Sequence, residues 1–136
     1  MPPYTEEFRV EDGIVLVRLS GTYPNDRLAS SDNLFQPLID ECRTNHHRWV
    51  IVDARELQVN FSTAALFRAG VDAASLRRFD LCVALLARKD MVSPFFDDVI
   101  RNRCALVEVF TDMESARRWI DARRPDAANA TASPVT

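Results

Sequence analysis

The chain has 136 residues, of which 47% are hydrophobic and 27% charged, and its formal net charge is −3 at pH 7. This length and composition are typical of one globular domain that needs no disulfide or metal to hold its core. The small net charge argues against a dedicated nucleic-acid-binding protein, which normally carries a basic stripe. The longest apolar run, residues 81–87, is too short to span a bilayer. We therefore expect a cytoplasmic domain without a membrane span.

The cysteines give no sign of a disulfide framework or a metal centre. There are three of them, Cys42, Cys82 and Cys104, far apart in apolar stretches and without a Cys-x-x-Cys pair. An odd number does not suit a secreted disulfide scaffold, so we expect buried and inert thiols. The adjacent histidines at 46 and 47 lack convergent partners at zinc-ligand spacing. The sequence predicts neither a metal site nor a cofactor.

The amino-terminal third of the chain predicts a β-hairpin and a helix. Polar and apolar residues alternate at 7–11, and β-branched residues are frequent at 14–19. Between them stands Asp12-Gly13, a favoured two-residue hairpin turn. After a polar loop, apolar residues recur at helical spacing over 35–42, and a capping box that begins at Asn33 precedes them.

The middle of the chain predicts a buried strand, a loop and a second helix. Residues 49–53 form a mostly apolar run that ends in an aspartate, as in a strand covered on both faces. Residues 55–61 have the composition of a loop. The pair Ser62-Thr63 is suited to cap the following helix, whose apolar face extends over 66–76.

The last part of the chain repeats the alternation. A fourth strand is expected at 81–87, and Ser93-Pro94 is a favoured helix start with the hydroxyl at the cap. A fifth strand is expected at 105–110, and the capping box Thr111-x-x-Glu114 then starts an amphipathic helix. Residues 125–136 are small, polar and proline-containing, which predicts a disordered tail.

These elements together predict one α/β domain over residues 1–124. A hairpin followed by alternating helices and strands implies a mostly parallel five-stranded sheet with four helices. Right-handed crossovers would then place the helices against the faces of the sheet.

Several core motifs resemble those of the SpoIIAA-like branch of the STAS superfamily, over roughly residues 8–123. Residues 79–84 follow the F-x-x-x-V-A pattern at the fourth strand, and 109–120 follow the closing strand and the A-x-x-W-[IL] helix. Gly21-Thr22 after the second strand fits as well. The resemblance implies a SpoIIAA-like fold and a non-enzymatic regulatory role. The best-known members antagonise an anti-sigma factor, and a kinase switches their binding.

The resemblance also implies a phosphoacceptor at the start of the helix after the third strand. The family motif there is Asp-Ser-Ser-Gly or Asp-Ser-Thr-Gly, whereas residues 61–64 of this chain are Phe-Ser-Thr-Ala. Thr63 would take the phosphoacceptor position beside Ser62. Free backbone N–H groups and the helix dipole would stabilise a phosphate at such a site. The same hydroxyls suit simple helix capping, and the sequence leaves both interpretations open.

The sequence thus supports more than one function. The first hypothesis is a regulatory module, not an enzyme, that binds a protein partner such as a kinase or an anti-sigma-like factor through the edge from Asp53 and Arg55 to Leu66. A homodimer is a further option. The alternative is a carrier or sensor of a small apolar ligand. The remotest alternative is an enzyme that uses Asp53 or an acid at 97 or 98, for which no nucleophile is evident. The expected ligand crevice would be lined by Phe61, Leu66, Phe95 and Phe96.

Overall fold

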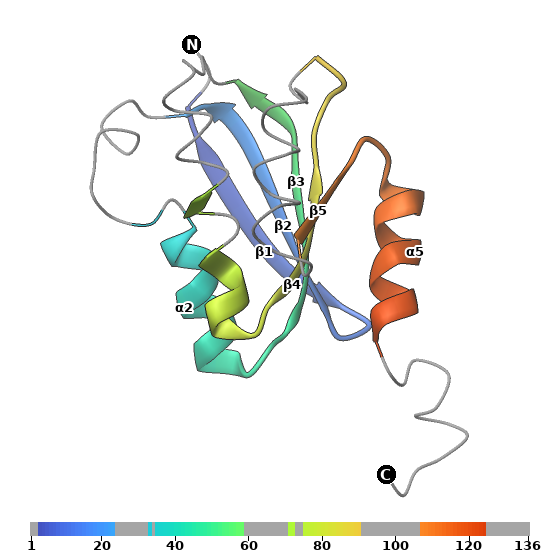
Figure 1. Ribbon diagram of the computed structural model, residues 1–136. Coiled ribbons are helices and arrows are strands. Elements are labelled where there is room, and N and C mark those ends of the chain that lie inside the picture. Colours follow the sequence, from blue (N-terminus) through green and yellow to red (C-terminus); the bar gives the residue numbers. More distant parts are fainter. Residues whose placement is uncertain are drawn as a thin grey trace, which may run out of the picture.

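The computed structural model describes residues 3–23, 33, 35–58, 71–72, 75–90 and 107–124. This part of the chain forms a five-stranded sheet with its strands in sequence order, flanked by two α-helices and a 3-10 helix (Figure 1). β1 is antiparallel to β2, and every later pair of neighbours is parallel. The predicted α/β class and mostly parallel five-stranded sheet are confirmed. The elements are β1 Thr5–Glu11, β2 Ile14–Thr22, α2 Gln36–Asn45, β3 Trp49–Gln58, η1 Ser75–Phe79, β4 Cys82–Leu86, β5 Val107–Phe110 and α5 Met113–Arg123.

Within the described residues, two of the four predicted helices are present as α-helices, namely α2 and α5. The predicted apolar helix face over 66–76 is wrong at its end, because Leu76 is fully buried but lies in the 3-10 helix η1. The expected helix starts at Ser62-Thr63 and at Ser93-Pro94 lie outside the described residues. So does the segment 125–136, for which a disordered tail was expected. These expectations stay predictions.

The hairpin forms where the sequence predicts it. Asp12 and Gly13 have φ angles of 56° and 78°, and two consecutive positive φ values are the requirement of a type I′ turn. This turn fixes the register, with Glu11 opposite Ile14 and Thr5 opposite Ser20.

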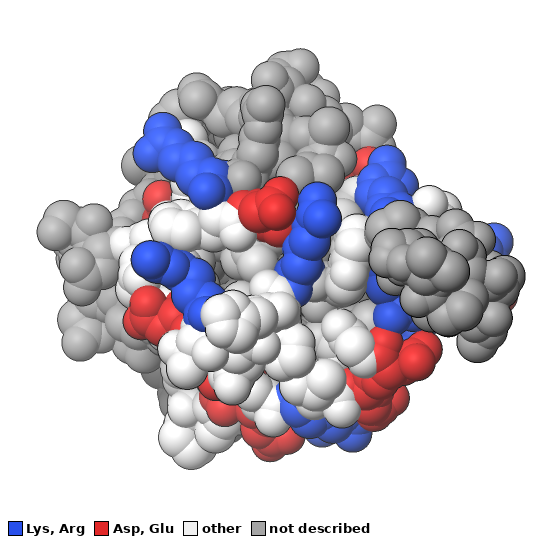
Figure 2. Space-filling view, turned by 90° about the horizontal axis from the view of Figure 1, so that it is seen from below, with Lys and Arg blue, Asp and Glu red and all other residues white. Residues whose placement is uncertain are grey.

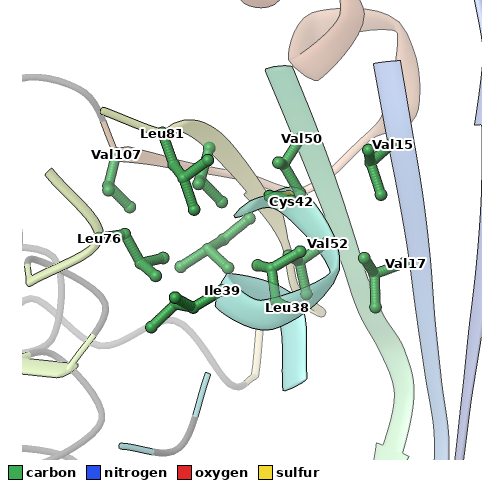
Figure 3. Close-up of a cluster of buried hydrophobic side chains, with 12 residues drawn as sticks. Val15, Val17, Leu38, Ile39, Cys42, Val50, Val52, Leu76, Leu81 and Val107 are labelled. Carbon is green, nitrogen blue, oxygen red and sulfur yellow. The ribbon is translucent and has the colours of Figure 1, made fainter. Parts of the chain in front are cut away.

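One face of the sheet packs against α2 and η1 (Figure 3). Side chains of a strand alternate between the two faces, so alternate residues of four neighbouring strands meet in one layer. α2 contributes Leu38, Ile39 and Cys42, and η1 contributes Leu76. The buried strand residues of this layer are Val15, Val17, Val50, Val52, Val83, Leu85 and Val107.

The opposite face packs against α5, which supplies the fully buried Ala116 and Ile120. Its contacts with the sheet fall mainly on β4, and also on β3 and β5 (Figure 1). Of the described helices, none packs extensively on the adjoining part of this face, which β1 and the residues of β2 beyond Ile14 form. The strand residues buried beneath α5 are Ile14, Ile51, Cys82, Ala84 and Leu86.

The third strand is longer than predicted. The residue pattern predicts its end at Asp53 and a loop over 55–61, but β3 continues to Gln58. The reason is tertiary: β2 also runs past Leu19, and its residues through Thr22 pair with this polar segment. Tyr23 N then donates to Gln58 O at 2.8 Å, which fixes the end of the strand.

Both predicted capping boxes are wrong. Asn33 Oδ1 accepts from the backbone N–H of Phe35 at 2.8 Å, within a turn that precedes α2, and the N-cap residue Phe35 makes no side-chain capping bond. Gln36 pairs with Asp40 on the helix surface instead of reaching back. A proline in the first turn already lacks one of the N–H groups that a cap would satisfy.

The α5 cap lies one residue later than predicted. Asp112, not Thr111, is the N-cap, and its carboxylate accepts from the backbone N–H of Ser115 at 2.8 Å. Glu114 pairs with Arg118 instead of closing a capping box. Aspartate is as good an N-cap as threonine, so composition alone does not distinguish the two registers.

Candidate functional site

Two of the predicted site residues, Asp53 and Arg55, lie in the described part of the chain, both in β3. The others are Phe61, Ser62, Thr63, Leu66, Phe95 and Phe96, and they lie outside it. The proposed phosphoacceptor and the proposed aromatic crevice therefore stay predictions. The site can be built from β3 and from what surrounds it.

A β-bulge brings Asp53 and Arg55 together. Arg18 pairs with Asp53 and Ser20 with Glu56, so β3 has one more residue than β2 over this interval. Such an extra residue kinks a strand and redirects side chains. Asp53 Oδ1 accepts from the backbone N–H of Arg55 at 3.1 Å and from its Nε at 2.9 Å, while Oδ2 accepts from Nη2 at 2.9 Å.

This contact keeps Asp53 ionised. Its side chain is 20% exposed. Burial opposes the charge, but the hydrogen bonds from the Arg55 side chain and backbone outweigh it, so the pKa of the Asp53 carboxyl lies below its usual value. A general acid or base for neutral pH needs a pKa near 7, and this carboxylate is already engaged through both oxygens. The geometry therefore does not suit Asp53 for acid–base catalysis. This weakens the remote alternative of an enzyme that uses Asp53.

Two further contacts fix the end of β3. Arg18 of β2 binds Glu56 through both Nε, at 2.6 Å, and Nη2. Arg88, which follows β4, donates from Nη1 to the backbone carbonyl of Arg55 at 2.7 Å and to that of Leu57 at 3.0 Å. Arg18 from β2 and Arg88 from the segment after β4 thus hold the end of β3, which presents an ordered array of charges of both signs.

A hollow of about 190 Å³ lies beside α5, on the half of the sheet face that β1 and β2 form. Its apolar lining includes Leu16, Ile51 and Met113, the first residue of α5. Four charged residues of alternating sign surround this apolar floor. They are Glu7, Arg9, Arg18 and Asp53.

Of these four charged residues, only Asp53 is among the site residues that the sequence predicts. The available signal was the period-two alternation of the hairpin, which puts Glu7 and Arg9 on one face of β1. The sequence does not reveal that α5 leaves most of this face of the hairpin uncovered, so the four charges could not be recognised as neighbours.

The described residues contain no cluster of three or more metal-ligating side chains. Among the same residues no helix is long and apolar enough to cross a membrane. Of the three cysteines, Cys42 and Cys82 are buried as expected, and Cys104 lies outside the described residues. Burial, and to a lesser degree the nearby Glu41, raises the pKa of the Cys42 thiol to about 11, so it stays protonated and unreactive at neutral pH.

The amino ends of the parallel strands form a second charged surface. Figure 2 shows this end of the molecule, where acidic and basic side chains alternate without a patch of one sign among the described residues. Ion pairs explain the mixture: Arg48 binds Asp80 at 3.4 Å, and Arg124 binds Asp121 at 2.7 Å. Arg124 also donates to the backbone carbonyl of Asp12 in the hairpin turn.

Solved structures place this architecture among SpoIIAA-like folds. An anti-sigma factor antagonist from Mycobacterium paratuberculosis superposes with a TM-score of 0.55 at 12% sequence identity, over 88% of this chain and 95% of its own. An uncharacterised protein of the DUF3478 family with a SpoIIAA-like fold, from Shewanella loihica, superposes with a TM-score of 0.53 at 12% identity, over the same shares of the two chains. No family model and no curated sequence matches the chain. The fold is therefore SpoIIAA-like, as the sequence motifs indicated.

Proposed function

We propose that this chain is a non-enzymatic regulatory module that binds a protein partner. The proposed binding surface comprises the hollow beside α5 and the stretch of sequence from Asp53 and Arg55 to Leu66. A similar structure is that of an anti-sigma factor antagonist. Its name denotes a regulator directed at another protein, which supports this class of function for a fold of the same kind.

One observation carries the proposal: the end of β3 is ordered and charged rather than a loop. We call this surface, formed by residues 53–58 and by Arg18, the platform. Its backbone is bonded to Tyr23 on one side and to Arg88 on the other. Ordered side chains lower the conformational entropy that is lost on binding. Both oxygens of the Asp53 carboxylate are engaged by Arg55, which suits this residue to recognition rather than acid–base catalysis.

The charges of the platform predict a salt-sensitive interaction. Arg18 and Glu56 have side chains that are more than half exposed, so replacing both with alanine should change the free energy of unfolding by no more than about 1 kcal/mol. We expect the same double variant to weaken partner binding about tenfold, because charges at an interface guide and orient the partner. Affinity capture from an extract of the native host, followed by calorimetry with the purified partner, measures this loss.

A matched control removes an ion pair at the opposite end of the strands. Arg48→Ala with Asp80→Asn breaks the Arg48–Asp80 pair, and asparagine tolerates the positive φ of 60° at position 80. This control should bind like the wild type. If both double variants retain the same proteins with equal affinity, the platform is not the binding surface and the proposal fails.

The regulatory switch is the second half of the proposal, with Thr63 as phosphoacceptor and Ser62 beside it. Incubation with a host extract and ATP should add the mass of one phosphoryl group to the wild type, and the modified protein should lose its partner because the added charge and oxygens alter a contact surface. Thr63→Ala should stay unmodified and keep its partner. An intact mass that never changes, or one that also changes in a Ser62→Ala/Thr63→Ala variant, argues against the switch.

The alternative function is that of a carrier or sensor of a small apolar ligand. The apolar floor of the hollow favours it, but about 190 Å³ is below the roughly 300–1,000 Å³ of a typical ligand pocket. We therefore place it second. A copurified ligand that native mass spectrometry detects on the purified protein would reverse this order.

A further inference from the structure

We propose that two copies of this chain associate through the edge strand β1 and form one continuous sheet. β1 pairs with β2 alone among the described strands, so its other side faces outwards in this part of the structure. The main-chain N–H and C=O groups of an edge strand are a template for pairing with another strand. The interface would relate the two copies by a two-fold axis, with each strand antiparallel to its counterpart.

The hairpin turn decides which groups of β1 face outwards. A two-residue type I′ turn is closed by a hydrogen-bonded pair, here Glu11 and Ile14. Hydrogen-bonded positions alternate along the strand, so Phe8 and Val10 direct their N–H and C=O groups away from β2. A second β1 can therefore bond to these residues without disturbing the existing ladder.

The charge pattern of β1 favours the register in which the two strands overlap fully. Charges on an edge strand usually prevent association, because like charges then meet across the new pair. When two copies of β1 are centred on Phe8, all seven residues overlap and Glu7 of each copy lies opposite Arg9 of the other. Centring on Arg9 or on Glu7 instead places like charges opposite each other, whereas the register with full overlap pairs opposite charges.

The side chains of these residues are available for such contacts. Arg9 is 71% exposed and pairs only with Glu11 of its own strand among the described residues. Glu7 is exposed, and its charge acts on Arg18 of the neighbouring strand. Among the large hydrophobic side chains of the described residues, Val10 is the exposed one, at 50%. In the proposed register it lies diagonally across from Phe8 of the second copy, where the two side chains can bury apolar surface.

The association would bring the hollows of the two copies next to each other. Glu7 and Arg9 also line the hollow beside α5, so their intermolecular pairs would lie between the hollows of the two copies. The inference does not depend on the proposed partner binding, because its observations all come from β1.

The test is a pair of charge reversals, each made alone and then mixed. Sedimentation velocity of the wild type over a concentration series should show a monomer–dimer equilibrium. Glu7→Arg and Arg9→Glu should each weaken self-association about tenfold or more, because each places two pairs of like charges across the axis. An equimolar mixture of the two variants should associate as well as the wild type, since every pair between them is again of opposite sign.

Two further measurements keep the result tied to β1. Circular dichroism of each variant should match the wild type, because both positions are exposed on the surface. Hydrogen exchange at the amides of Phe8 and Val10 should slow as the wild-type concentration rises. A wild type that stays monomeric at every concentration, or a dimer that neither reversal weakens, would overturn the proposal whatever the outcome for partner binding.

Discussion

Replacing Gly21 with alanine is expected to cost about 3–5 kcal/mol of folding free energy, the largest effect of a single substitution that we foresee. Gly21 has a φ of +82°, a region that residues with a side chain rarely adopt. An added Cβ would stand 1.9 Å from the backbone oxygen of Pro3 and 2.6 Å from its carbonyl carbon. These are main-chain atoms, so relief requires the start of β1 to move. Urea denaturation followed by circular dichroism measures the loss.

Gly13 is the matched control for this variant. It has a similar φ of +78°, but an added Cβ meets only Arg124 Nη1 at 3.6 Å, an ordinary contact. Gly13→Ala should therefore incur the backbone penalty alone, about 1 kcal/mol. If the two variants lose equal stability, the close approach of Pro3 to Gly21 does not matter and the expected difference is wrong.

Replacing Ile120 with alanine should cost about 2–5 kcal/mol, because it leaves a cavity where α5 meets the sheet. Ile120 is fully buried, and the other fully buried residue of this helix is already an alanine, Ala116. Ile120 is thus the main large anchor of α5. The loss should appear as a lower midpoint in thermal unfolding and in urea.

The control lies on the exposed side of the same helix. Arg118 is 72% exposed and pairs with Glu114, a contact worth only a few tenths of a kcal/mol on a helix surface. Arg118→Ala should leave the unfolding midpoint almost unchanged. Comparable destabilisation by both substitutions would mean that helix propensity rather than packing holds α5 in place.

The two candidate surfaces depend on these structural features. Met113 lines the hollow and belongs to α5, so the packing of Ile120 also positions the hollow. Gly21 stands where β2 continues beside the end of β3, opposite Leu57. Its conformation therefore supports the platform that we propose as the partner-binding surface.

Sequence patterns predicted the class of the fold and its mostly parallel five-stranded sheet. Local rules suffice for this, because a two-residue Asp12-Gly13 turn and the alternation of β1 specify a hairpin without reference to distant residues. Buried strands such as β3 were found for the same reason, since a continuous apolar run must be covered on both faces. The resemblance to SpoIIAA-like proteins rests on similar core positions, which is why it gave the fold correctly.

The details that depend on distant residues were not predictable in this way. β3 extends past Asp53 because β2 runs beside it, and the polar residues of this segment gave no sign of a strand. The α5 cap moved from Thr111 to Asp112 because both residues are good caps.

By itself, then, the sequence determined the α/β class, the hairpin, the parallel sheet and the burial of Cys42 and Cys82, because periodicity and turn chemistry act between residues close together in the chain. Only the tertiary structure decided that Glu7, Arg9, Arg18 and Asp53 surround one hollow and that Arg88 holds the end of β3. These residues come from different strands, and the placement of α5 and a one-residue bulge in β3 determine which of them meet. No local pattern records either fact.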